Sequence, residues 1–374
     1  MARTQAALYE EIARGEELAL SWSEAELPER ERTKHVHRLH PYLGKFIPQL
    51  VERLLDRYVR PRGHVLDPFA GSGTTLVQAL ESGYDATGID VAAFNALLMR
   101  VKTARYDALR LQRELREALA RLGRSKRRPD GYVREWFASD AAGELLHFRD
   151  LVSEFEHADV LRVVLARAAR SARLTRHFDL DFPRTPQREP YWCHKHRRTC
   201  HPVTEANKFL SRYLLDTLRR LREFELVRAR GCVAQVLHGD AREIELDAEY
   251  DAIVTSPPYP GLIDYHEQHR YAYELLDLDD RRERELGAAS RGTSRAALEE
   301  YSAGIAGVLS RCARWLSPGA PVLVVVNDRR DLYPRILRTA GLDVEDRLER
   351  HVNRRTGRRA GEYFESIFVA YARG

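Results

Sequence analysis

Short apolar strands and longer helical segments alternate across residues 64–104, and this alternation limits the possible folds more than any other feature of the chain. The pattern predicts a strand at 64–67 and a helix over 71–83. A second strand at 85–91 and a second helix over 92–104 follow. Two parallel strands cannot be joined by a tight turn, so helical crossovers of this length indicate a parallel sheet with helices packed on its faces.

Further strand-like segments extend this sheet toward the C-terminus. They lie at 233–240, 250–259, 320–328 and 366–373, and a helical pattern over 298–316 separates the second from the third. We therefore expect an α/β fold with a parallel or mixed sheet and helices on both faces.

The chain is longer than one hydrophobic core usually supports, and its charge is uneven. It has 374 residues and a formal net charge of +5, whereas single cores rarely grow beyond about 250 to 300 residues. Residues 105–230 contain 28 Lys and Arg against 18 Asp and Glu, a local charge of +10 that leaves −5 for the remainder. We expect these residues to form a helical insertion that binds a polyanion.

The α/β domain is then discontinuous, over 34–104 and 231–374. Residues 1–33 form an N-terminal extension with a helix at 5–33.

Composition also favours a cytoplasmic protein. No apolar run approaches the roughly 18 residues of a membrane-spanning helix, and the N-terminal segment lacks the apolar centre of a secretion signal. The four cysteines, Cys193, Cys200, Cys232 and Cys312, are too few for a disulfide framework in a chain of this length.

A glycine-rich loop at 67–75, DPFAGSGTT, joins the first predicted strand to its helix. Glycines at such a junction allow a ligand to approach the backbone, and the helix N-terminus offers free N–H groups. The loop lacks the Lys of a triphosphate-binding loop, so it suits a different nucleotide-like ligand.

Asp90 ends the second strand, where an acidic side chain commonly binds ribose hydroxyls, and Asp240 ends the third strand in the same way.

A second motif, Ser256-Pro257-Pro258-Tyr259, directly follows the apolar strand at 250–255. Two consecutive prolines remove two N–H donors and fix two φ angles, which leaves carbonyl oxygens rigidly placed beside a hydroxyl and an aromatic ring. Such an arrangement favours binding of a flat group that carries an amino group.

Together with HPYLGKF at 40–46, these two motifs resemble the S-adenosylmethionine-dependent DNA amino-methyltransferases, in particular the branch that modifies N4 of cytosine. The resemblance implies a Rossmann-like methyltransferase fold. It implies that Asp90 binds the ribose of S-adenosylmethionine, that Asp240 lies on the adenine side, and that Ser256 to Tyr259 receive a flipped base. The residues that it assigns to the methionine part of the cofactor are Tyr42, Lys45, Phe46, Asp67, Phe69, Gly71, Ser72, Gly73 and Thr74.

The mechanism that the resemblance implies is direct methyl transfer, because no cysteine lies near the proline motif. Ser256 Oγ and the Pro257 carbonyl can accept the two amine hydrogens and orient the nitrogen lone pair, while Tyr259 stacks on a base taken out of the duplex. The polar residues that follow the motif are further candidates for the pocket wall: Asp264, Tyr265, His266, His269 and Arg270.

Basic clusters in and beyond the insertion are candidates for contact with double-stranded DNA. The first cluster comprises Arg124, Lys126, Arg127 and Arg128, the second Lys195, Arg197 and Arg198, and the third Arg354 and Arg355.

Two cysteines and three histidines lie around the second cluster: Cys193, His194, His196, Cys200 and His201. Their spacing fits no common zinc finger. We therefore expect no metal there.

Other functions remain open at this level. Methylation of adenine N6 is the first alternative, since Ser in place of Asp before the prolines goes mostly, though not always, with cytosine in the resembling family. An RNA guanine-N2 methyltransferase and a catalytically inactive DNA-binding protein are further alternatives. A site-specific enzyme of this kind is expected to be nucleoid-associated and to have a restriction endonuclease for the same site as a possible partner, without a stable complex.

Overall fold

The computed structural model describes residues 20–44, 46–354 and 361–373. Most of the helix expected at 5–33 lies outside these ranges. Within residues 20–33, the structure has turns followed by the four-residue helix α2 (Glu29–Arg32). The 3-10 helix η1 (His35–Arg38) comes next along the chain.

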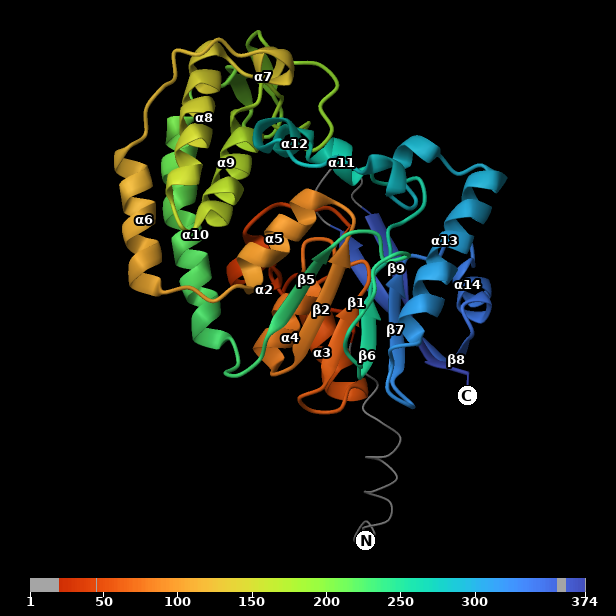
Figure 1. Ribbon diagram of the computed structural model, residues 1–374. Coiled ribbons are helices and arrows are strands. Elements are labelled where there is room, and N and C mark those ends of the chain that lie inside the picture. The colour runs from red at the N-terminus through yellow and green to blue at the C-terminus, as the bar shows by residue number, and fades with distance from the viewer. Residues whose placement is uncertain (1–19, 45, 355–360, 374) are drawn as a thin grey trace, which may run out of the picture.

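A seven-stranded sheet forms the centre of the molecule (Figure 1). Its strands are β1 (His64–Asp67), β2 (Asp85–Asp90), β5 (Ala234–His238), β6 (Ala252–Thr255), β7 (Pro321–Val326), β8 (Leu342–Arg354) and β9 (Gly361–Ala372). Their spatial order is β5-β2-β1-β6-β7-β9-β8; the first five are parallel, and β9 is antiparallel to both its neighbours. The predicted Rossmann-like α/β fold is confirmed.

Helices cover both faces of this sheet because successive side chains of each strand point to opposite sides. Val65 packs in the cluster formed with helix α3 (Pro48–Tyr58) and part of α4 (Thr74–Ser82). Leu66 packs on the other face, in the cluster that contains α13 (Arg295–Ala313) and α14 (Tyr333–Thr339).

Strand β8 has no counterpart among the predicted strands. It pairs with β9 at the edge of the sheet, and its register shifts between Val344 and Asp346. Its sequence, LDVEDRLERHVNR, alternates apolar with charged residues, as edge strands often do to avoid pairing with other chains. The basic pair Arg354 and Arg355 therefore begins with the last residue of a strand, and Arg355 lies outside the described ranges.

The insertion is mainly helical, as predicted, and lies beside the α5 and β5 edge of the sheet (Figure 1). Its elements are α6 (Ala108–Ala120), α7 (Gly131–Trp136), α8 (Ser139–Leu151), η2 (Val152–Glu154), α9 (Ala158–Ala172), the hairpin β3 (Tyr191–Cys193) and β4 (Arg198–Cys200), and α10 (Asn207–Val227).

The insertion shares its hydrophobic core with the α/β domain. Phe94 and Leu97 of α5 (Ala93–Thr103) belong to the same buried cluster as Val164 of α9 and Leu210 of α10. Helix α12 (Arg270–Leu276), which follows the proline motif, joins this cluster through Tyr271. Among the described helices, none combines the length and apolar character needed to cross a membrane.

Candidate active site

A pocket opens at the carboxyl ends of the parallel strands, between β1 and β6. Strands β1, β2 and β5 follow one another outward in one direction, whereas β6 lies on the other side of β1. Ligands of open α/β sheets bind at such a reversal of strand order. The empty volume, which includes solvent at the open mouth, is about 820 Å³.

Ten of the residues that the resemblance assigned to the cofactor site and to the proline motif line this pocket together. They come from the segment before α3, from the glycine loop, from the ends of β2 and β5, and from the proline motif. They are Tyr42, Phe46, Phe69, Gly71, Ser72, Thr74, Asp90, Asp240, Ser256 and Pro258. Lys45 lies outside the described residues.

The glycine loop is held open toward the pocket by its backbone conformation. Gly71 has a φ of 52°, and a Cβ at this position would lie 2.9 Å from the Tyr42 hydroxyl. Its N–H donates to Asp90 Oδ2 at 2.9 Å. The Tyr42 ring stacks on Tyr265, with ring centroids 5.1 Å apart. Only glycine therefore permits this approach between the loop and the aromatic wall.

Asp67 and Gly73 lie beneath the loop, outside the pocket lining. Asp67 Oδ1 accepts the hydroxyl of Thr255 at 2.6 Å, and Oδ2 accepts that of Thr75 at 2.6 Å. Burial raises the pKa of Asp67 to about 6, although these hydroxyls and the Phe69 N–H oppose the shift. Gly73 caps α4 with a φ of 80°. Both residues shape the loop from below.

Asp90 presents its carboxylate at the centre of the pocket wall. Oδ1 accepts the Ala92 N–H at 2.8 Å and the Asn95 amide at 3.1 Å, while Oδ2 accepts the Gly71 N–H. Burial raises the pKa of Asp90 to about 7, against the effect of these donors. Two carboxylate oxygens offer about four lone pairs, so one acceptor position on Oδ2 remains for a ligand hydroxyl.

Asp240 also lines the pocket, but its carboxylate already binds a cation. Arg242 Nε lies 2.9 Å from Oδ1, and Arg242 Nη2 lies 2.5 Å from Oδ2. Burial alone would raise the pKa of Asp240; the hydrogen bonds and charge of Arg242 outweigh burial and lower it. The side chain is therefore an ionised part of the wall rather than a free acceptor.

The proline motif leaves β6 with its serine facing the pocket. Ser256 Oγ is buried and has no hydrogen-bond partner among the described residues. The Pro258 carbonyl accepts the Tyr301 hydroxyl at 2.8 Å, and Tyr259 donates its hydroxyl to Glu365 at 3.2 Å. Pro257 and Tyr259 do not contribute to the pocket lining. The motif is thus anchored through Pro258 and Tyr259, while Ser256 lines the site.

Of the five polar residues proposed for the pocket wall, Asp264, Tyr265, His266, His269 and Arg270, only Tyr265 lines the pocket. Asp264 caps the short helix α11 (Tyr265–Gln268). His266 is fully buried and pairs with Glu285 at 2.9 Å. His269 is buried against Tyr42, and burial lowers its pKa to about 3. Arg270 is exposed and lies over Tyr132. The expectation that Asp264, His266, His269 and Arg270 line the pocket is therefore wrong.

Three other polar residues of the pocket, Asn95, Arg284 and Glu285, were missed by sequence reasoning. Asn95, on the first turn of α5, donates to both Asp90 and the Tyr42 hydroxyl, at 3.1 and 3.2 Å. Glu285 is buried in the wall and accepts the Tyr265 N–H at 2.8 Å. The position of Asn95 five residues after Asp90 was a usable signal, since a helix begins there. Glu285 lies in a charged segment, beside the 3-10 helices η3 (Arg282–Arg284) and η4 (Ala289–Arg291), that resembles a surface loop.

The basic residues selected from the sequence lie away from the pocket lining. Arg124 forms an ion pair with Asp140, whereas Lys126, Arg127 and Arg128 are exposed in the loop between α6 and α7. Lys195, Arg197 and Arg198 are exposed on the hairpin β3–β4. Arg354 ends β8, and Arg355 lies outside the described residues.

Comparison with known proteins places this chain in a defined class of enzyme. A family profile described as DNA methylase, for N6 and N4 methyltransferases, matches residues 3–96. Type II methyltransferase M.MjaII of Methanocaldococcus jannaschii is 33% identical over 91% of this chain and 81% of its own length. Type II methyltransferase M.MvaI of Kocuria varians is 26% identical over 65% of this chain and 58% of its own. The solved structure of TrmN from Thermus thermophilus is 15% identical, with a TM-score of 0.36, and covers 88% of this chain and 50% of that one.

The chain belongs to the family of type II DNA methyltransferases that modify amino groups. It is an enzyme whose methyl donor is S-adenosylmethionine. The predicted membership of the DNA amino-methyltransferases is thereby confirmed.

The geometry of the glycine loop leads to a first prediction. Gly71→Ala should lower the free energy of unfolding by about 1–2 kcal/mol, because a side chain disfavours a positive φ and its Cβ would press on the Tyr42 hydroxyl. Thermal denaturation of the purified variant measures the loss. Gly307→Ala is the matched control: this glycine lies within α13 with open space around its Cβ position, so stability should rise by up to about 1 kcal/mol. Equal stability of Gly71→Ala and the unchanged protein would contradict the account of the loop.

Proposed function

We propose that this enzyme methylates the exocyclic N4 of a cytosine that is flipped out of double-stranded DNA at a short specific site. The observation that carries the proposal is the buried hydroxyl of Ser256, which has no partner among the described residues, in a residue that lines the same pocket as the glycine loop and Asp90. A buried polar atom without a partner is costly and commonly marks a site that is completed by a ligand.

The residues of the pocket fit S-adenosylmethionine, which supplies an electrophilic methyl group when bound. Ser72 offers a second buried hydroxyl without a partner among the described residues, and Gly71 leaves the loop backbone accessible. We assign the methionine part to the glycine loop with Tyr42 and Phe46. The remaining acceptor position of Asp90 suits one ribose hydroxyl. Because Arg242 already engages the carboxylate of Asp240, we assign Asp240 to the wall beside the adenine.

This assignment predicts that cofactor affinity depends on Asp90. Asp90→Asn should weaken S-adenosylmethionine binding by about 1–3 kcal/mol, the usual loss for a hydrogen bond to a charged acceptor. Calorimetric titration of the cofactor measures the effect. Asp343→Asn is a suitable control because Asp343 is exposed at the start of β8 and pairs with Arg373. If both variants bind the cofactor as tightly as the unchanged enzyme, the ribose assignment fails.

The chemistry proposed for the chain's own residues is orientation of a weak nucleophile. The lone pair of an exocyclic amine is delocalised into the ring, so it must be localised and directed. Ser256 Oγ and the Pro257 carbonyl accept the two amine hydrogens and thereby fix the nitrogen, and alignment of this kind can contribute up to about 7 kcal/mol. No cysteine is among the residues that line the described pocket, in agreement with direct transfer to the amine.

Serine before the prolines supports cytosine over adenine. Its hydroxyl is short and uncharged, and it can accept from the amine while donating elsewhere. Tyr259 is held in place through Glu365, and we assign its ring to stacking on the flipped base. Adenine N6 remains the alternative substrate, because its amine is conjugated to a ring in the same manner. Methylation at this site would also protect host DNA from a restriction endonuclease with the same specificity.

The choice of base and the role of Ser256 can be tested together. DNA treated with enzyme and cofactor should yield N4-methylcytosine when its nucleosides are analysed by mass spectrometry. Ser256→Ala should bind S-adenosylmethionine normally but lose most of the turnover, since the deleted hydroxyl binds the reacting amine rather than the cofactor. Ser310→Ala, on the half-buried side of α13 and outside the pocket lining, is a matched control that should keep its rate.

Each other outcome of this experiment has a definite meaning. N6-methyladenine would replace the proposal with the alternative substrate, and 5-methylcytosine would refute direct transfer to an amine. Activity on RNA guanine, or no transfer to any DNA, would exclude the proposed function. Near-normal turnover in Ser256→Ala would show that the hydroxyl does not orient the amine.

We further propose that the helical insertion, residues 105–230, contacts the DNA and contributes to target recognition. The observation that supports this is the exposed basic loop at Lys126, Arg127 and Arg128, for which no carboxylate partner is found among the described residues. The exposed hairpin residues Lys195, Arg197 and Arg198 form a second candidate contact, and Arg354 and Arg355 a third. Lysine and arginine contacts to phosphates fix the register of a protein on the duplex.

Replacement of Lys126, Arg127 and Arg128 by Gln should weaken binding to all DNA sequences. The slope of log affinity against log salt should flatten by roughly 0.9 for each phosphate that the variant no longer neutralises, because fewer counterions are released. Fluorescence anisotropy at several salt concentrations gives both quantities. Arg295→Gln is the control, since this exposed arginine lies on α13 and pairs only with Glu299 among the described acidic groups. An unchanged slope in the triple variant would exclude the loop from the DNA interface.

A further inference from the structure

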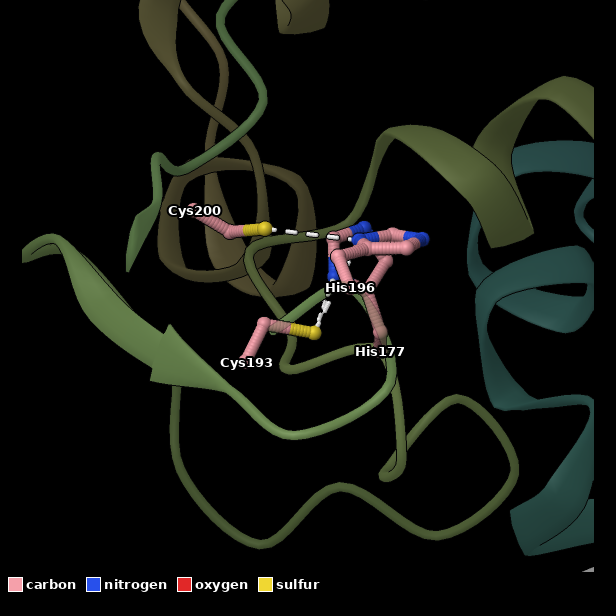
Figure 2. Close-up of side chains that lie close together, drawn as sticks. All are labelled: His177, Cys193, His196 and Cys200. Atoms are coloured by element: carbon pink, nitrogen blue, oxygen red, sulfur yellow. Dashed lines mark hydrogen bonds between the residues drawn. The ribbon is translucent and has the colours of Figure 1, made fainter. Parts of the chain in front are cut away.

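Two cysteines and two histidines converge in the helical insertion, away from the methyltransferase pocket. Cys193 ends β3, His196 lies in the turn of the hairpin, and Cys200 ends β4. His177 comes from the loop after α9, sixteen positions before Cys193. Figure 2 shows the two thiol groups and the two imidazole rings directed toward one another. One ligand atom from each residue lies within 4.8 Å of all the others.

The distances between these atoms match those of a tetrahedral zinc site. With Zn–S bonds of about 2.3 Å and Zn–N bonds of about 2.0 to 2.1 Å, sulfur and nitrogen ligands of one zinc ion lie about 3.5 to 3.6 Å apart. Cys193 Sγ lies 3.4 Å from His177 Nδ1 and 3.6 Å from His196 Nδ1. His196 Nδ1 lies 3.4 Å from Cys200 Sγ. Both cysteines are free thiols.

The hairpin that carries three of these residues lacks an apolar core of its own. Each strand has three residues, and the cysteine is the only buried residue in either strand. Trp192 is 58% exposed. An isolated two-stranded hairpin is at best marginally stable in water, and small units of this kind commonly depend on a disulfide or a metal ion.

We propose that His177, Cys193, His196 and Cys200 bind one structural zinc ion. Two thiolates and two imidazoles form a closed tetrahedral set, which is typical of structural rather than catalytic zinc. The ion would join the loop after α9 to both strands of the hairpin. Tyr191 supports the same junction, because its hydroxyl accepts the backbone N–H of His177 at 3.1 Å.

The site differs from the set that the sequence suggested. Residues 193–201 alone offer two cysteines and three histidines, but a tetrahedral site within nine residues closes awkwardly. His194 and His201 are exposed and do not belong to the cluster. His177 supplies the fourth ligand from a distant loop, so the expectation that no metal binds here is replaced by the present proposal. Lys195, Arg197 and Arg198 lie within the segment that the zinc ion would hold in place.

The test uses the full chain, purified without a histidine tag or chelators, and elemental analysis by mass spectrometry. We expect about one zinc per chain. Cys193→Ser and His177→Ala should reduce bound zinc to near zero. Cys232→Ser and His201→Ala are the matched controls and should keep it, because neither residue belongs to the cluster. Circular dichroism of each variant shows whether the remaining helical fold is intact.

A replacement that preserves a ligand distinguishes metal binding from simple packing. His196→Cys should retain zinc, whereas His196→Ala should lose it, although both shorten the side chain. Cobalt added to the metal-free protein should give the visible absorption of a tetrahedral thiolate site, and this absorption should be missing in Cys200→Ser. Lack of both zinc and cobalt binding by the unchanged chain would overturn the proposal. Zinc retained in His177→Ala but lost in His201→Ala would overturn it as well.

Discussion

The buried carboxylate of Asp67 connects the two halves of the candidate site. It ends β1 and accepts the hydroxyl of Thr75 from the helix after the glycine loop and the hydroxyl of Thr255 from the last position of β6. Ser256 follows Thr255 directly, so the glycine loop and the proline motif depend on one buried group. Such a group is costly to bury and is stable only when its donors are in place. The relative position of the two motifs therefore follows from a single side chain beneath the pocket.

The central part of the fold could be predicted from the sequence because local pattern and tertiary environment agree there. Strands such as β6 and β7 are buried on both faces and form continuous apolar runs, which are easy to recognise. Strand β8 was missed for the opposite reason. It lies at the edge of the sheet, where charged side chains are favourable, and its composition resembles that of a charged surface segment.

The residues of the candidate site likewise divide into those that the sequence could predict and those that it could not. Gly71 and Asp90 could be selected because each lies at a strand end, and Tyr42 because it belongs to the motif at 40–46. The place of Asp67 beneath the loop could not be foreseen, because sequence distance does not show whether a side chain points into a pocket or away from it. Glu285 and His177 could not be found, since each reaches its partners from a distant loop of polar composition. Such partnerships depend on the path of the chain in space and leave no local periodicity.

The core that α5 shares with α9 and α10 has a consequence for attempts to alter sequence specificity. Phe94 and Leu97 share a buried cluster with side chains of the insertion, and the same helix begins at Ala93, three residues after Asp90. Grafting the insertion of a relative onto this scaffold would therefore expose or mismatch the apolar face of a helix that also borders the cofactor pocket. A functional chimera must exchange α5 together with the inserted helices, or redesign the interface between them. The insertion and the α/β domain share one hydrophobic core and therefore cannot be exchanged independently.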